Sequence, residues 1–188
     1  MKTIRLTPTS YIVLGLLMHA DGVTPYELKA LVARGVGNLW SLQHTQLYAE
    51  PERLAAAGYL TETREEGGRR RKLYSITPSG RQAFGLWLTA ELTAELPELR
   101  DIGLLKVFFG AEPAPIAAEQ LRAHREKLRE YPQLEQALAS PGPPIPELAT
   151  TELAGPGPLS TLRAGIGHER EWIRYWADLA GEAVDPVG

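Results

Sequence analysis

The chain has 188 residues, contains no cysteine and carries a formal net charge of −3 at pH 7. The lack of cysteine excludes disulfides, thiolate metal sites and cysteine nucleophiles. An apolar run over residues 11–18 is too short to span a bilayer and has no evident signal-peptide cleavage site. We therefore expect a soluble, cytoplasmic protein.

Charge is unevenly distributed along the chain. Residues 1–90 contain 11 Lys and Arg against 7 Asp and Glu, whereas residues 91–188 contain 9 against 16. Such asymmetry is typical of a chain in which one domain meets phosphate and another does not. Small domains also differ by a few charges without any functional reason, so the charge alone does not establish a nucleic-acid partner.

The N-terminal segment begins with two predicted helices. Thr7-Pro8 is a typical helix start, and apolar residues follow at helical spacing until the turn residues Asp21-Gly22. A second, short helix is expected over residues 26–32, after Thr24-Pro25.

A third helix is expected from about Ser41 to Ala57, closed by Gly58 in the position just past its end. Pro51 lies inside this stretch, where it removes a backbone hydrogen bond and crowds residue 47. The helix is therefore expected to be either kinked or shorter than its pattern suggests.

A β-hairpin is predicted next. Strand candidates over residues 59–64 and 69–77 flank Gly67-Gly68, and Gly-Gly between two alternating runs is typical of a hairpin turn. Thr77-Pro78 then starts a fourth helix. The order helix, helix, helix, hairpin, helix is that of a winged helix, whose third helix enters the DNA major groove while the hairpin follows the backbone.

Two groups of side chains suit DNA binding. Polar residues at the start of the third helix can bond base edges or phosphate oxygens, and consecutive cations after the Gly-Gly turn can reach phosphates. A solvated helix face and a solubilising hairpin tip are the plainer interpretations of each group taken alone, but together they favour DNA. The candidates are Ser41, Gln43, His44, Thr45, Gln46 and Tyr48 on the helix, and Arg69, Arg70, Arg71 and Lys72 on the wing.

The segment from Tyr11 to Arg81 resembles the PadR family of bacterial transcriptional regulators. The order and spacing of several pieces carry this resemblance. They are Tyr11–Leu17 in the first helix, Thr24–Leu28 at the second, Gln46–Tyr48 with Leu54 and Gly58–Leu60 around the third, and Gly68–Lys72 and Tyr74–Arg81 in the wing and its exit. Pro51 departs from the family's commoner pattern, in which a proline directly follows the tyrosine. The resemblance implies effector-responsive regulation, most often repression.

The C-terminal half is expected to be helical, with a Pro/Gly-rich loop over residues 140–158. A charged helix is predicted over residues 116–138, and a last helix ends near Ala180. Apolar residues of the last helix recur at three-four spacing and need cover, either from a second subunit or from packing within one subunit. The candidate dimer-interface residues are Leu159, Leu162, Ile166, Trp172, Ile173, Trp176 and Leu179.

The family resemblance extends more weakly over residues 104–110 and the last helix, and it implies a helical dimerisation region. The sequence thus predicts a mainly α protein with a small β-hairpin wing. Its two domains are a winged helix-turn-helix DNA-binding domain over residues 1–88 and a C-terminal α-helical dimerisation domain over residues 89–188.

The expected function is that of a sequence-specific transcriptional regulator, a repressor by resemblance, that binds a pseudo-palindromic operator as a homodimer. Release by a small aromatic or apolar effector near Trp172 or Trp176 is a further hypothesis. The alternative is a winged helix that binds another protein instead of DNA. Such a module has no need of the four consecutive cations of the wing.

No enzyme motif is found in the sequence. His19, His44, His124 and His168 lack the spacing of metal ligands, and Gly165 and Gly167 lie on a predicted helix rather than in a nucleotide-binding loop after a strand. We therefore expect neither catalysis nor a metal or cofactor.

Overall fold

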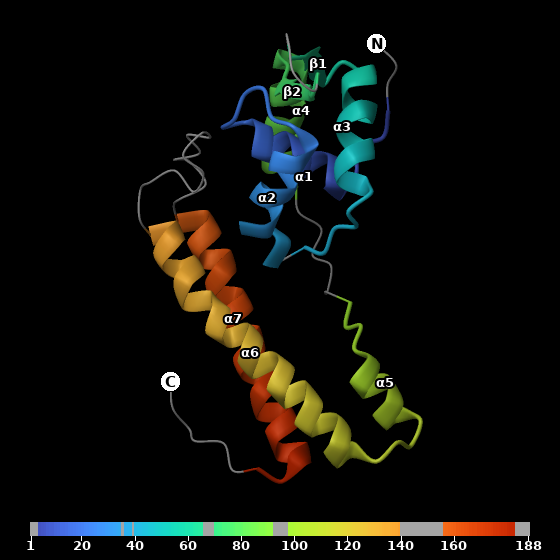
Figure 1. Ribbon diagram of the computed structural model, residues 1–188, viewed down its shortest axis with the longest axis vertical. Helices are drawn as coiled ribbons and strands as arrows, with labels where there is room; N and C mark the ends of the chain where they lie inside the picture. The colour runs from blue at the N-terminus through green and yellow to red at the C-terminus, as the bar shows by residue number, and fades with distance from the viewer. Residues whose placement is uncertain are drawn as a thin grey trace. The chain divides into compact units, whose positions relative to one another are not determined.

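The computed structural model describes residues 4–34, 36–38, 40–65, 70–91, 98–139 and 156–182. Its elements are mostly helices, with one pair of strands (Figure 1). In chain order they are α1 (Pro8–Leu17), α2 (Pro25–Arg34), the 3-10 helix η1 (Val36–Asn38), α3 (Gln46–Ala56), β1 (Leu60–Arg64), β2 (Lys72–Ile76), α4 (Pro78–Thr89), α5 (Ile102–Phe108), α6 (Pro113–Ala139) and α7 (Pro156–Ala180).

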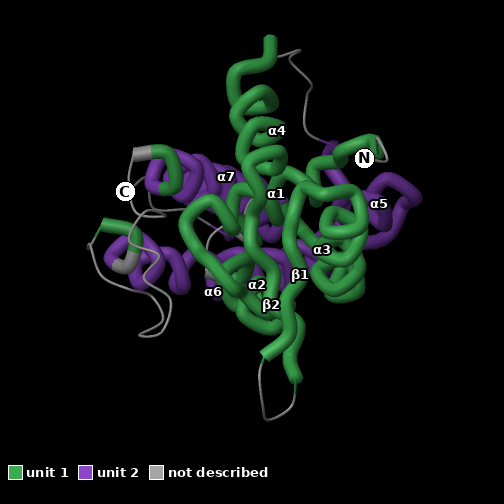
Figure 2. Tube along the Cα trace, turned by 90° about the horizontal axis from the view of Figure 1, so that it is seen from above, with its two compact units in different colours: residues 1–92, 137–158 green, residues 93–136, 159–188 purple. Residues whose placement is uncertain are grey.

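The chain divides into two compact units (Figure 2). Unit 1 comprises residues 1–92 and 137–158, and unit 2 comprises residues 93–136 and 159–188. Unit 1 contains three helices, a hairpin and a fourth helix in the predicted order, and unit 2 is helical. The fold is therefore a winged helix followed by a helical region, as predicted. The predicted boundary after residue 88 falls in the last turn of α4 and stays a prediction.

Helix α1 begins where the sequence predicts. The side chain of Thr7 accepts a hydrogen bond from the backbone N–H of Ser10, and the Ser10 side chain accepts one from the backbone N–H of Thr7, which forms a capping box. The helix ends at Leu17, about one turn before the Asp21-Gly22 pair that the sequence marks as its end. Those two residues lie in the following loop, where Gly22 adopts a φ of 63°.

Helix α3 is shorter than its sequence pattern. It begins at Gln46 rather than at Ser41, and Pro51 lies inside it. A turn precedes the helix, because the backbone N–H of Gln43 donates to Gln46 Oε1 and the backbone N–H of Gln46 donates to the Gln43 carbonyl, both at 3.0 Å. The helix is therefore shorter than its pattern at the N-terminal end, and it continues past Pro51 to Ala56.

The hairpin is joined to the helices through Tyr74. Strands β1 and β2 pair antiparallel, with Leu60 opposite Ile76. The backbones of Val23 and Tyr74 exchange two hydrogen bonds of 3.0 and 2.9 Å, which attach the loop before α2 to β2. The core of unit 1 gathers apolar residues of α1, α2, α3, the hairpin and the loop before α2: Val13, Leu14, Leu16, Leu17, Val23, Leu28, Leu31, Val32, Leu47, Leu54, Leu60 and Tyr74.

Tyr74 makes the stability of the fold depend on pH at the alkaline end. Its side chain is fully buried, and its hydroxyl donates to Glu62 Oε2 at 3.1 Å. Burial and then the charge of Glu62 raise the pKa of Tyr74 from 10.0 to about 12. Because the folded state keeps a proton that the unfolded chain releases, this stabilisation is complete below pH 10 and is lost as the pH rises to about 12.

We therefore expect the free energy of unfolding to fall by roughly 2–3 kcal/mol between about pH 10 and pH 12. The Tyr74→Phe variant should lose this part of the pH dependence, because it has no phenol to ionise. Denaturant titrations at a series of pH values measure it. The Tyr26→Phe variant is the control, since Tyr26 is 74% exposed and should leave the profile unchanged. A profile equally steep in Tyr74→Phe would contradict the assignment.

Helices α6 and α7 of unit 2 lie side by side and run antiparallel (Figure 1). His124 Nδ1 of α6 lies 2.5 Å from Glu169 Oε2 of α7, and the His124 ring stacks on Trp172 with 5.8 Å between centroids. The buried core of this unit consists of Ala117, Leu121, Trp176 and Ala177.

The apolar stripe of α7 is thus partly covered by its own chain. Leu162 is 5% exposed and Trp176 is fully buried, whereas the other five predicted interface residues are half-buried. Trp176 therefore packs within its own subunit, which is one of the two forms of cover that the sequence leaves open for the apolar stripe. The described part of the chain contains no helix long and apolar enough to cross a membrane, and no group of three His, Asp or Glu that could hold a metal ion occurs there.

Candidate nucleic-acid interface

The outward face of α3 is the first part of the candidate interface. Leu47 and Leu54 are buried in the core of unit 1. At about 3.6 residues per turn, Tyr48 and Glu52 lie on the opposite side of the helix, and both are exposed. Gln46, in the first turn, is exposed as well. This face can present polar side chains to the edges of bases.

Four of the predicted contact residues lie in the segment before α3 rather than on it: Ser41, Gln43, His44 and Thr45. All four are exposed. His44 stacks on Tyr48 with ring centroids 5.5 Å apart, so the segment packs against the first turn of the helix. The prediction that these residues occupy the helix start is wrong, but they remain beside it. Their contact with DNA stays a prediction.

The wing cations have different surroundings. Arg69 lies outside the described residues. Arg70 is exposed and has a φ of 48°, in the region that non-glycine residues rarely adopt. Arg71 donates two hydrogen bonds to the carboxylate of Glu65, at 3.0 Å from Nε and 2.7 Å from Nη2. This pairing with Arg71 lowers the pKa of Glu65.

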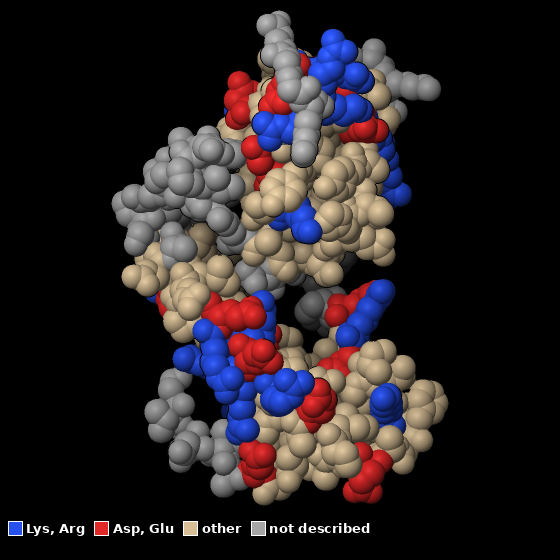
Figure 3. All heavy atoms as spheres, in the orientation of Figure 1, with Lys and Arg blue, Asp and Glu red and all other residues tan. Residues whose placement is uncertain are grey.

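Lys72 connects the wing to α3. Its Nζ lies 2.5 Å from Glu52 Oε1 of α3 and 3.4 Å from Glu62 Oε2 of β1. The hydrogen bond to Glu52 is the main reason that the pKa of Lys72 is raised. The last of the four predicted cations therefore links the two elements that a winged helix presents to DNA. Figure 3 shows basic and acidic side chains intermingled at this end of unit 1.

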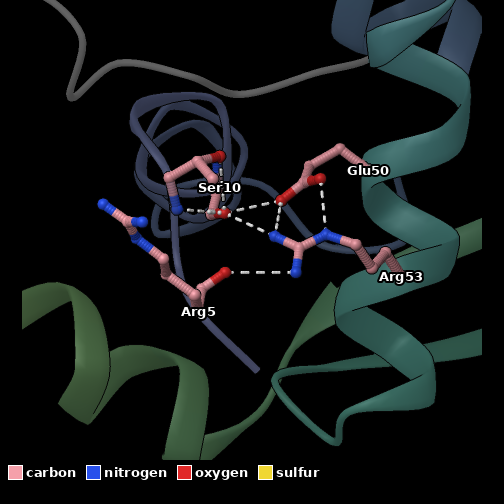
Figure 4. Close-up of polar contacts among 5 residues, drawn as sticks. Arg5, Ser10, Glu50 and Arg53 are labelled. Atoms are coloured by element: carbon pink, nitrogen blue, oxygen red, sulfur yellow. Dashed lines mark hydrogen bonds and ion pairs between the residues drawn. The ribbon is translucent and has the colours of Figure 1, made fainter. Parts of the chain in front are cut away.

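The inward face of α3 is held to α1 by a polar cluster (Figure 4). The hydroxyl of Ser10 donates to Glu50 Oε1 at 2.6 Å. Arg53 Nη2 donates to the same carboxylate oxygen at 2.6 Å and to Ser10 Oγ at 2.9 Å. Arg53 Nε donates to Glu50 Oε2 at 2.9 Å, and Nη1 donates to the Arg5 carbonyl at 3.2 Å. The hydrogen bond to Glu50 raises the pKa of Arg53.

Glu50, Glu52 and Arg53 were absent from the residues predicted from the sequence. Glu52 and Lys72 form their ion pair across 20 residues, and local sequence gives no signal for such a contact. Helical periodicity counted from the apolar Leu47 and Leu54 assigns Glu50 to the buried side of the helix and Glu52 to the exposed side.

Comparison with known proteins shows which proteins this arrangement resembles. Residues 13–86 match the model of the transcriptional regulator PadR-like family, and residues 99–185 match that of the virulence activator alpha C-terminal region. A curated relative, the negative transcriptional regulator PadR of Bacillus subtilis strain 168, is 29% identical over 142 residues, which cover 71% of this chain and 76% of the relative.

Solved structures share the fold. Bacillus subtilis PadR in complex with operator DNA superposes with a TM-score of 0.74 and 21% identity, covering 95% of this chain and 99% of that one. The complex of Bacillus subtilis PadR with p-coumaric acid gives a TM-score of 0.66 at 21% identity, over 92% of this chain and 96% of that one. Residues 13–86 are thus similar to the PadR-like family of transcriptional regulators, and the chain shares the fold of the solved PadR structures.

Proposed function

We propose that this protein is a sequence-specific DNA-binding repressor that binds a pseudo-palindromic operator as a homodimer. The observation that supports this most directly is the Lys72–Glu52 ion pair, which links the wing to the outward face of α3. A winged helix uses these two elements together, one in the major groove and one along the backbone. A relative that is a negative transcriptional regulator, and whose fold has been crystallised with operator DNA, supports the same function.

The two elements have separate chemical roles in this proposal. Gln46 and the neighbouring residues of α3 meet base edges, where an amide can pair with adenine in two hydrogen bonds. Arg70 meets a phosphate, because its exposed guanidinium has no ion pair among the described residues. Arg71 and Lys72 bind phosphate only when the phosphate replaces Glu65 or Glu52 as the partner. Exposed ion pairs contribute roughly 0–1 kcal/mol each, so this exchange costs little.

Two variants should separate these roles. Gln46→Ala is expected to weaken binding to the preferred duplex about tenfold while leaving binding to scrambled DNA unchanged, because it removes a hydrogen-bonding partner of a base. Arg70→Gln should weaken binding to both duplexes and reduce the slope of log affinity against log salt by roughly 0.9 for each phosphate that is no longer neutralised. Arg170→Gln, an exposed change in α7, is the matched control.

The measurement is a fluorescence-anisotropy titration at several salt concentrations. Its duplex is one that the wild-type protein has selected from a randomised library. The alternative function is a winged-helix module that binds protein. Wild-type protein that selects no duplex and shows no salt-sensitive retention on DNA would favour that alternative and overturn the repressor proposal.

The homodimer forms, in our proposal, through unit 2. The predicted α7 residues that keep exposed area are Leu159, Ile166, Trp172, Ile173 and Leu179. Helix α5 and its C-cap residue add a stronger apolar surface, since Ile102 is 68% exposed, Phe108 80% and Phe109 77%. Large apolar side chains clustered on one exposed element are typical of a protein interface. Leu162 and Trp176 support the interface from beneath, because they are covered within their own chain.

The Phe108→Ser, Phe109→Ser double variant should therefore weaken the dimer by at least about tenfold, because two apolar side chains are removed from the interface. Sedimentation velocity over a range of protein concentrations measures the effect. The control is Leu86→Ser in α4, which is 64% exposed but lies in unit 1. A double variant that dimerises as tightly as wild type would place the interface elsewhere.

A small aromatic effector completes the proposal, supported by the p-coumaric acid complex of the Bacillus subtilis protein. Of the two predicted tryptophans, Trp172 is the accessible one, because Trp176 is fully buried. Titration of wild type and Trp172→Phe with p-coumaric acid, followed by tryptophan fluorescence, tests its role. No response in wild type would contradict effector binding. A repressor of this kind acts in the cytoplasm, where its operator lies, and needs no catalytic activity.

A further inference from the structure

Helix α3 is held to α1 by directional polar contacts as well as by apolar packing. We propose that Ser10, Glu50 and Arg53 are positioning residues that set the rotation of α3, and so determine how well the protein distinguishes its operator from other DNA. This inference rests on the proposed DNA-binding function. None of the three residues is among the residues proposed to contact bases.

The cluster is buried enough to act as a fixed contact. Ser10 is fully buried, Glu50 is 9% exposed, and the Arg53 guanidinium covers the carboxylate with a two-pronged hydrogen bond (Figure 4). The Ser10 hydroxyl is saturated, since it donates to Glu50 and accepts from the Thr7 backbone N–H at 2.8 Å and from Arg53. Every charge in the cluster therefore has a defined partner, as buried charged groups require.

Helix α3 needs such a contact more than an ordinary helix does. Its N-cap, Thr45, makes no side-chain capping hydrogen bond, and Pro51 removes one backbone hydrogen bond from the middle. Leu47 and Leu54 bury its apolar side, but hydrophobic burial is non-directional. A planar guanidinium paired with a carboxylate tolerates only a narrow range of orientations. The cluster is thus the feature that fixes rotation about the helix axis.

A change in rotation would reach both parts of the interface. Glu50 lies one helical turn after Gln46, and Glu52, whose carboxylate holds Lys72 of the wing, is two residues further on. Turning α3 moves Gln46 and Tyr48 relative to the bases, and moves the wing through the Lys72–Glu52 pair. The contact between α1 and α3 therefore affects specificity without touching DNA itself.

The test compares Glu50→Gln with Glu119→Gln, a change of the same chemistry at an exposed position of α6. Anisotropy titrations measure the ratio of affinities for the library-selected duplex and for its scrambled version. Glu50→Gln should lower this ratio about tenfold, which corresponds to the discrimination that one well-placed side chain gives at a base. Glu119→Gln should leave the ratio near the wild-type value, because this residue lies in unit 2 and outside the proposed DNA interface. Ser10→Ala, a smaller change at the same cluster, should lower the ratio in the same direction.

Hydrogen exchange supplies a readout that does not involve DNA. In Glu50→Gln and Ser10→Ala the backbone amides of α3 should exchange faster while those of α2 keep their wild-type rates. Folded variants with wild-type ratios, or with uniformly faster exchange throughout unit 1, would overturn the positioning role. If Glu50→Gln fails to fold, the affinity ratio and the hydrogen exchange of Ser10→Ala decide whether the cluster positions α3. If wild type itself shows no preference between duplexes, the proposed function fails, while exchange in α3 still reports on the cluster.

Discussion

Replacing Gly80 by alanine is expected to destabilise the winged helix by about 3 kcal/mol or more. A Cβ atom at this position would lie 2.3 Å from the carbonyl oxygen of Tyr59 and 2.8 Å from Ile76 Cγ1. The first of these is a backbone atom, so a rotamer change cannot relieve the clash. It is also fixed, because it accepts hydrogen bonds from the Thr77 backbone N–H and from the Thr77 hydroxyl, at 3.1 and 3.0 Å.

The matched control is Gly85→Ala, five residues further along the same helix α4. A Cβ atom there meets no described atom within 4 Å, and alanine favours a helix interior over glycine by about 1 kcal/mol. The two substitutions are therefore expected to act in opposite directions. Thermal unfolding followed by circular dichroism measures both. Equal melting temperatures for Gly80→Ala and wild type would mean that the junction between hairpin and α4 is looser than the structure indicates.

The same junction shows what could be predicted from the sequence. Thr77-Pro78 predicts the start of α4 correctly, and the Thr77 side chain accepts a hydrogen bond from the Gly80 backbone N–H. The N-cap of α1, the hairpin and the order of elements are predictable for the same reason. They follow from hydrogen bonds between residues a few positions apart or from strict alternation. The sequence does not predict that position 80 must be glycine. The atom that excludes a side chain there belongs to Tyr59, which lies in the connection between α3 and β1, far from Gly80 in the sequence.

The candidate site was less predictable because its contacts are long-range. Residues 41 and 43–45 are polar and have the composition of an exposed helical face. A turn closed by the Gln46 side chain nevertheless precedes the helix, which begins only at Gln46. Ser10 and Glu50 are 40 residues apart in the chain, and each alone is an ordinary polar residue. The apolar stripe of α7 was correctly expected to need cover, but its spacing is the same whether α6 of the same chain or a second subunit supplies that cover.

Trp176→Ala is expected to lower the free energy of unfolding by about 3–5 kcal/mol. Trp176 is fully buried between α6 and α7, and its neighbours Ala117 and Ala177 are too small to fill the space that its indole would leave. Its ring also contacts those of Trp172 and Tyr175, at centroid distances of 6.0 and 5.1 Å. Removing the indole would therefore weaken the α6–α7 contact on which the proposed dimer surface rests.

Trp176→Phe distinguishes the volume of the side chain from its polarity. The Trp176 Nε1 atom is buried without a hydrogen-bond partner in the described part of the chain, and an unpaired buried donor costs roughly 1–3 kcal/mol. Phenylalanine removes that donor while keeping most of the apolar contact. We therefore expect Trp176→Phe to cost much less than Trp176→Ala, and Tyr175→Ala, at a 42% exposed position, to cost about 1 kcal/mol or less. Denaturant unfolding measures all three. A loss in Trp176→Phe as large as that in Trp176→Ala would show that the indole N–H is satisfied in solution, for example by a buried water molecule.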